Sequence, residues 1–161
     1  MNKKALNAFY QSGRAIGLCE IGARADISLS GAPGMSPFQV AATIAGASFR
    51  VDLPPVKSED DLMPVLCASE ALQQAVKRGA VKSNQAALER IVGGAVIEAS
   101  RHIMALKHIS SSEIARERST QVAERAAELV KWKWHSIKKL AAELRTRRSL
   151  SDCDVRSLIG V

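Results

Sequence analysis

The chain has 161 residues, of which 47% are hydrophobic and only 4% aromatic, and its formal net charge is +7. This length suits one domain with a single substantial core and is short for two, so we expect one domain over residues 1–161. Abundant alanine and few β-branched runs favour packed helices over a β-sandwich or a β-barrel.

The three cysteines, Cys19, Cys67 and Cys153, are odd in number and widely spaced. This spacing predicts neither a disulfide framework nor a cysteine zinc site. Gln11 and Arg14 interrupt the apolar run that an N-terminal export signal would need. No stretch approaches the roughly 18 to 20 apolar residues of a membrane-spanning helix. We therefore expect a cytoplasmic protein that makes no contact with a membrane.

The first third of the chain predicts two helices and two short strands. Helical spacing of apolar and small residues indicates a helix over residues 3–21, and Gly22 is a natural stop for it. The alternation in ADISLS predicts a strand over residues 25–30. A serine and a proline open a helix over residues 36–48, and SFRVDL predicts a second strand over residues 48–53.

Two further helices follow in the middle of the chain. Ser58 and Asp61 fit a capping box, in which a hydroxyl is followed three residues later by an acid. The box starts a helix over residues 62–78, with an interruption or kink expected near Pro64. Another helix is expected over about residues 83–107.

The C-terminal third predicts a long apolar stripe and a short last helix. Ser110 and Glu113 fit another capping box, and Ser151 with Asp154 fits a third. Trp132 lies off the stripe, so we expect it to be partly exposed. The stripe, which must be buried, consists of Val122, Ala126, Val130, Trp134, Ile137, Ala141 and Leu144. Two short strands among these helices make the fold class α+β, predominantly α-helical.

The positive charge is concentrated near the C-terminus. Residues 1–80 hold eight Lys/Arg and seven Asp/Glu, whereas residues 81–161 hold fifteen and nine. Such a segment could bind phosphate or an acidic partner, or it could be a solvated helix face. The cations of this candidate binding surface are Lys131, Lys133, Lys138, Lys139, Arg145, Arg147 and Arg148.

Four stretches follow one another along the chain: YQSGRAIG, TIAGASFRVD, KSEDDL and WHSIKKLAAELRTRRSLSDCDVRSLI. Their order resembles the peptidase domain of FtsH-type ATP-dependent zinc metalloproteases, and more closely the small stand-alone members of that clan. In that family the first helix carries H-E-A-G-H-A and the last helices read W-x-x-I-x-x-L-A-x-x-L. The resemblance spans nearly the whole chain and implies a helical peptidase-like domain with a small two- to three-stranded sheet.

The resemblance places five residues of this chain at positions of the family's zinc site. Tyr10 stands at the first zinc histidine, Gln11 at the general-base glutamate and Arg14 at the second histidine. Gly13 keeps a small residue of the motif. The third ligand, an aspartate, falls on Asp61, which is otherwise only the acid of a capping box.

The replaced residues remove the family's chemistry. In H-E-x-x-H two histidines one helical turn apart hold the zinc, and the glutamate takes a proton from the zinc-bound water. Tyr10 is a neutral phenol, Gln11 has no basic site, and the cation of Arg14 would repel a metal ion. We therefore expect no metal, no other cofactor and no proteolysis. Arg14 could instead pair with Asp60 or Asp61.

The sequence leaves several hypotheses open. The first is a pseudoenzyme that keeps the peptidase scaffold and binds a peptide or a protein. The alternative is a small basic helical module that binds nucleic acid or an acidic partner. An active metalloprotease with ligands drawn from elsewhere in the chain is the third. FtsH-type proteases work as hexamers, so the resemblance is also compatible with a homo-oligomer.

Overall fold

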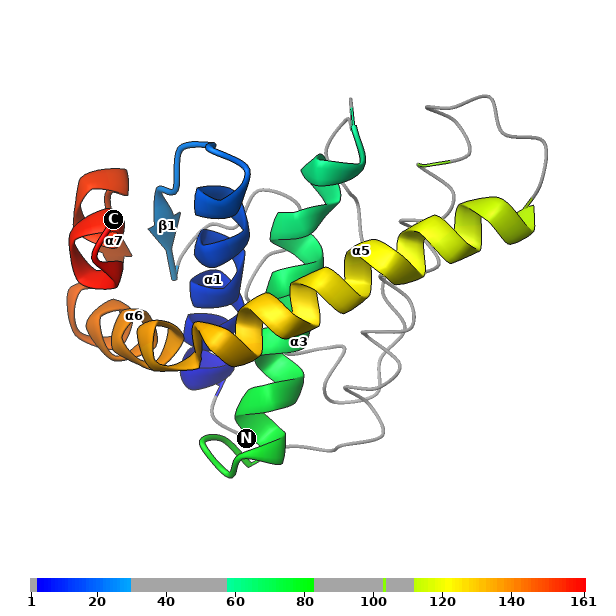
Figure 1. The fold of residues 1–161 in the computed structure, drawn as a ribbon. Coiled ribbons are helices and arrows are strands. Elements are labelled where there is room, and N and C mark those ends of the chain that lie inside the picture. Colours follow the sequence, from blue (N-terminus) through cyan, green and yellow to red (C-terminus); the bar gives the residue numbers. More distant parts are fainter. Residues whose placement is uncertain (1–2, 30–57, 83–102, 104–111) are drawn as a thin grey trace.

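The structure, a computed structural model, describes residues 3–29, 58–82, 103 and 112–161 (Figure 1). Within this part the chain is mostly helical with one small antiparallel sheet, which confirms the expected α+β, predominantly helical class. The elements are α1 (Lys3–Glu20), β1 (Ile27–Ser28), η1 (Glu59–Leu62), α3 (Met63–Lys77), α5 (Ser112–Trp132), α6 (Trp134–Arg147), β2 (Ser149–Leu150) and α7 (Asp152–Ile159).

Some of the predicted elements lie outside the described residues. These are the helix over residues 36–48, the strand over residues 48–53 and nearly all of the helix over residues 83–107. Of this last helix only Ile103 is described, and it is helical. Ser110 also lies outside them. No helix of the described part is long and apolar enough to span a bilayer.

The core is organised around close packing of α1 against α3. A Cβ atom added to Gly13 would lie 2.5 Å from Cβ of Ala71 and 2.6 Å from the carbonyl oxygen of Cys67. One added to Gly17 would lie 2.7 Å from Cα of Pro64. The later glycine of α1 thus contacts an earlier part of α3, so the two helices run antiparallel. The two glycines let the backbones approach to a distance that any side chain would prevent.

The predicted end of the first helix is confirmed. Gly22 has a φ of 71°, in the left-handed region. Its N–H donates to the carbonyl of Cys19 at 3.1 Å, and the N–H of Ala23 donates to the carbonyl of Leu18 at 2.9 Å. This pair of hydrogen bonds is a Schellman motif, which satisfies carbonyl groups at the helix end.

The expected interruption near Pro64 is a change of helix type. The chain forms the 3-10 helix η1 up to Leu62 and continues directly as α3 from Met63. Pro64 stands in the first turn of α3, where its missing N–H costs no intrahelical hydrogen bond. The proline therefore starts the α-helix and does not bend it.

The apolar stripe of the C-terminal third is buried, as predicted, but two helices carry it. α5 ends at Trp132 and α6 begins at Trp134, with Lys133 between them. Trp134 is 7% exposed, and its ring stacks on Phe9 with the centroids 5.6 Å apart. Trp132 is 79% exposed, which confirms that it lies off the stripe.

The small sheet joins the segment after α1 to the segment between α6 and α7. β1 pairs with β2 in antiparallel register, with Ile27 opposite Leu150 and Ser28 opposite Ser149. The N–H of Leu29 extends the pairing by donating to the carbonyl of Arg148 at 3.0 Å. β2 was not expected from the sequence, because two residues are too few to show an alternation of polar and apolar side chains.

Candidate functional site

The positions that correspond to the zinc motif lie on one buried face of α1. Tyr10, Gln11 and Arg14 share this face with Asn7, because residues three and four apart lie on the same side of a helix. We call these four residues the polar face of α1. Asn7 and Tyr10 are buried, Gln11 is 0% exposed and Arg14 is half-buried. The sequence analysis did not propose Asn7 as a site residue. Its spacing of four from Gln11 could have indicated that the two residues share a helix face.

Several buried polar atoms of this face have no hydrogen-bond partner. Nδ2 of Asn7 donates to the carbonyl of Leu29 at 2.7 Å. Within the described part, Oδ1 of Asn7, both Oε1 and Nε2 of Gln11, and Nη1 of Arg14 are buried and unpartnered. Leaving such a group unpaired costs about 1 to 3 kcal/mol. Gln11, with both polar atoms of its amide unpaired, therefore has the largest free-energy cost of burial on this face.

Tyr10 and Arg14 lie one helical turn apart, and each influences the ionisation of the other. Burial raises the pKa of Tyr10 to about 12, although the nearby positive charge of Arg14 acts in the opposite direction. Burial also lowers the pKa of Arg14, and Tyr10 partly opposes this change. The phenol keeps its proton at neutral pH, and the guanidinium keeps its charge. Neither group can act as a general base or as a ligand of a cation.

Asp61 does not join the polar face of α1. Its Oδ2 accepts a hydrogen bond from the backbone N–H of Ser58 at 3.2 Å, which is the contact expected of a capping acid. Asp60 pairs with Arg125 at 3.5 Å. The hypothesised ion pair of Arg14 with either acid is therefore absent from the described contacts. η1 packs against α3 and α5, beyond the end of α3 that contacts Gly17.

Gly13 has a structural role that needs no motif to explain it. Its place at the crossing with α3 requires a residue without a side chain. The spacing of four between Gly13 and Gly17 is the signal that could have predicted this crossing. Among the described residues, no group of three His, Cys, Asp or Glu side chains could hold a metal ion.

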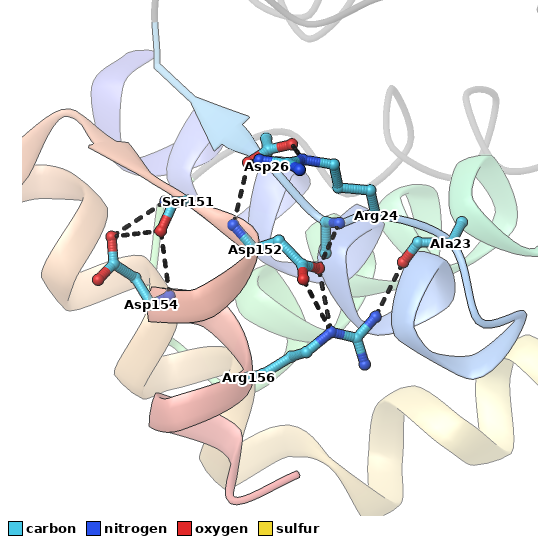
Figure 2. Close-up of polar contacts among 8 residues, drawn as sticks. Ala23, Arg24, Asp26, Ser151, Asp152, Asp154 and Arg156 are labelled. Atoms are coloured by element: carbon cyan, nitrogen blue, oxygen red, sulfur yellow. Dashed lines mark hydrogen bonds and ion pairs between the residues drawn. The ribbon is translucent and has the colours of Figure 1, made fainter.

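A second polar cluster ties the segment after α1 to α7 (Figure 2). Oδ1 of Asp26 accepts a hydrogen bond from the N–H of Asp152 at 3.0 Å, and Oδ1 of Asp152 accepts one from the N–H of Ala25 at 2.8 Å. Arg156 donates to Asp152 and to the carbonyl of Ala23 at 3.0 Å. Each of these carboxylates has a partner among the described residues, so the cluster connects the segment after α1 to α7.

The predicted cap of the last helix is part of this cluster. The N–H of Asp154 donates to Oγ of Ser151 at 3.2 Å, and the N–H of Ser151 donates to Oδ2 of Asp154 at 3.1 Å. These two hydrogen bonds form the expected capping box. Arg147 adds an ion pair to Asp154 at 3.2 Å.

A small cavity lies beside this cluster. Its volume is about 130 Å³, and its walls include Cys19, Leu129, Lys133, Arg156 and Ile159. Ligand pockets usually measure about 300 to 1,000 Å³. Burial also raises the pKa of the Cys19 thiol, so the thiol is a poor nucleophile. This cavity is therefore not a candidate site.

The cations of the C-terminal segment are on the surface. Lys133 is half-buried, with its ammonium 4.8 Å from the centre of the Trp132 ring. The others are exposed: Lys131, Lys138, Lys139, Arg145, Arg147 and Arg148. The structure thus separates two candidate sites, a buried polar face on α1 and an exposed basic surface at α5 and α6.

Comparisons of the chain with models of protein families, with curated proteins and with solved structures found no match. The resemblance to FtsH-type peptidases therefore rests on the motifs of this chain and stays a hypothesis.

Proposed function

We propose that this chain is a degenerate metallopeptidase-like domain, a pseudoenzyme that binds an unfolded polypeptide instead of cleaving it. The observation that carries this proposal is the amide of Gln11, which is completely buried and unpartnered among the described residues. Gln11 stands where the related peptidases have their general base. A buried amide that lacks partners favours a ligand able to provide them.

The chemistry of the polar face supports binding without hydrolysis. Peptide hydrolysis by this family needs an activated water and a base to take its proton. The polar face offers a protonated phenol, two amides and a guanidinium, and none of these accepts a proton at neutral pH. The same groups are good hydrogen-bond partners for a peptide backbone.

The spacing of the two amides suits an extended peptide. Asn7 and Gln11 are four residues apart, which is a rise of about 6 Å along a helix. Every second residue of an extended chain is about 6.6 Å from the last. Since both side chains are buried in the free chain, one peptide could meet both amides with alternate residues only by displacing the segments that cover them. Asn7 already donates to a carbonyl of this kind, that of Leu29, the residue after β1.

The variant Gln11→Leu tests the proposal because it keeps the size of the side chain and removes the amide. Without a buried unpaired amide, the variant should unfold at higher urea concentration, with a gain of about 1 kcal/mol or more. It should also bind fluorescein-labelled casein, an unfolded polypeptide, at least tenfold more weakly than the original chain. Fluorescence anisotropy measures this affinity, and gel electrophoresis shows whether the casein stays intact.

Gln121→Leu is the matched control, because Gln121 is exposed on α5. It should change neither stability nor casein binding. A Gln11→Leu variant that is less stable than the original chain would mean that the amide is satisfied in the folded state. That result, or casein binding equal to that of the original chain, would overturn the proposal.

A further inference from the structure

The basic surface at the junction of α5 and α6 contains cations that pair with no acid among the described residues. Two arginines nearer the start of α5 pair with acids: Arg118 pairs with Glu59, and Arg125 pairs with Asp60. The described part of the chain offers no such partner to four exposed cations near the junction. They are Lys131, Lys138, Lys139 and Arg145.

Three of these cations, Lys138, Lys139 and Arg145, are on α6 and lie off its buried face, whereas Lys131 is near the end of α5. The buried face of α6 consists of Trp134, Ile137, Leu140, Ala141 and Leu144, and it packs on α1. Lys138 and Lys139 therefore point away from the core, as their exposure shows. Arg145 lies two helical turns beyond Lys138, a rise of about 10 Å.

Trp132 adds a flat aromatic group at the junction of α5 and α6. It is the most exposed large hydrophobic side chain of the described part, at 79%, and it stands between two lysines in the chain. The ammonium of Lys133 lies 4.8 Å from the ring centre, so one cation is already held beside the indole. An exposed aromatic ring next to cations is the combination that proteins use to bind unpaired bases and their phosphates.

We propose that this basic surface, made of Lys131, Trp132, Lys133, Lys138, Lys139 and Arg145, binds single-stranded nucleic acid. A base stacks on Trp132 and the flanking phosphates contact the cations. The ring could not stack in this way on the paired bases of a duplex. An acidic polypeptide would match the charges and would have no planar base for the indole, so the stacking contact separates the two kinds of partner.

Fluorescence anisotropy with a labelled oligothymidylate of about 20 nucleotides tests the proposal. In about 0.15 M salt we expect submicromolar affinity for the single strand and weaker binding of a duplex of equal length. The logarithm of the affinity should fall with the logarithm of the salt concentration, with a slope of about −3 for four or five phosphate contacts. Poly-glutamate of equal charge should compete poorly.

Three variants assign the binding to this surface. Trp132→Ala should weaken single-strand binding at least tenfold and leave the salt slope unchanged. Lys138→Glu should weaken binding and reduce the size of the salt slope by about 0.7, the value for one phosphate contact. Arg116→Glu is the matched control: it makes the same charge change at an exposed site on α5, about 24 Å from Trp132 along the helix. It should change the affinity less than twofold.

Each contrary outcome has a definite meaning. If Trp132→Ala binds as the original chain does, or if Arg116→Glu is as harmful as Lys138→Glu, the proposal is wrong. Stronger binding of poly-glutamate than of the oligonucleotide would assign the surface to an acidic protein. Circular dichroism and the emission of the buried Trp134 show that each variant is folded. Gln11→Leu lies outside this surface, so the casein proposal and this one can fail separately.

Discussion

Replacing Trp134 with alanine tests the placement of α6 against the core. The side chain is almost completely buried, stacks on Phe9 with the rings within 9° of parallel, and has the guanidinium of Arg78 5.1 Å from its centre. Truncation of a buried tryptophan costs roughly 3 to 5 kcal/mol, which includes the cavity that remains. Folded proteins typically have a total stability of about 5 to 15 kcal/mol. Trp134→Ala should therefore remain folded with a much lower urea midpoint.

Urea denaturation followed by far-ultraviolet circular dichroism measures this loss. Trp132→Ala is the matched control, because the other tryptophan is exposed, and it should change the stability by less than about 0.5 kcal/mol. A double-mutant cycle of Phe9→Ala with Trp134→Ala should give a coupling of about 0.5 to 1.5 kcal/mol for the stacked rings. An unchanged midpoint for Trp134→Ala, or equal losses for the two tryptophans, would refute the assigned orientation of α6.

Three further predictions follow from other parts of the chain. Elemental analysis of the purified protein should find no stoichiometric zinc, and casein should not be hydrolysed; one zinc per chain that is lost in Asp61→Ala would contradict this. Arg148→Gly should raise the unfolding free energy by about 1 kcal/mol, because Arg148 has a φ of 66°, where glycine is not strained; a loss of stability in thermal melts would disprove it. Hydrogen bonds and ion pairs hold the pKa values of Asp26, Asp152 and Asp154 below their ordinary value of 3.8. The ionised aspartates therefore stabilise the fold above about pH 3.8, and this contribution is lost as the pH falls through their lowered pKa values. Asp152→Asn should be less stable than the original chain at neutral pH and equally stable in strong acid.

Local signals in the sequence were sufficient to predict many helices and their ends. The first helix and its stop at Gly22, the capping box at Ser151 and the buried stripe through Trp134 all depend on residues a few positions apart. Helix caps and helical periodicity are short-range interactions, so the sequence displays them directly. The same reasoning predicted that Trp132 lies off the stripe and is partly exposed, and its side chain is 79% exposed.

The tertiary structure alone decided which surfaces meet. β2 forms because Ser149 and Leu150 pair with β1, which is more than 100 residues away along the chain. The two residues by themselves do not predict a strand. Gly13 resembled a remnant of a zinc motif, yet its position is explained by the backbone of α3, which passes too close for any side chain. The sequence also showed that Gln11 cannot act as a base. That the amide of Gln11 is buried and has no described partner is known only from the tertiary structure. Burial depends on the residues that pack against α1 in space and not on the neighbours of Gln11 in the chain.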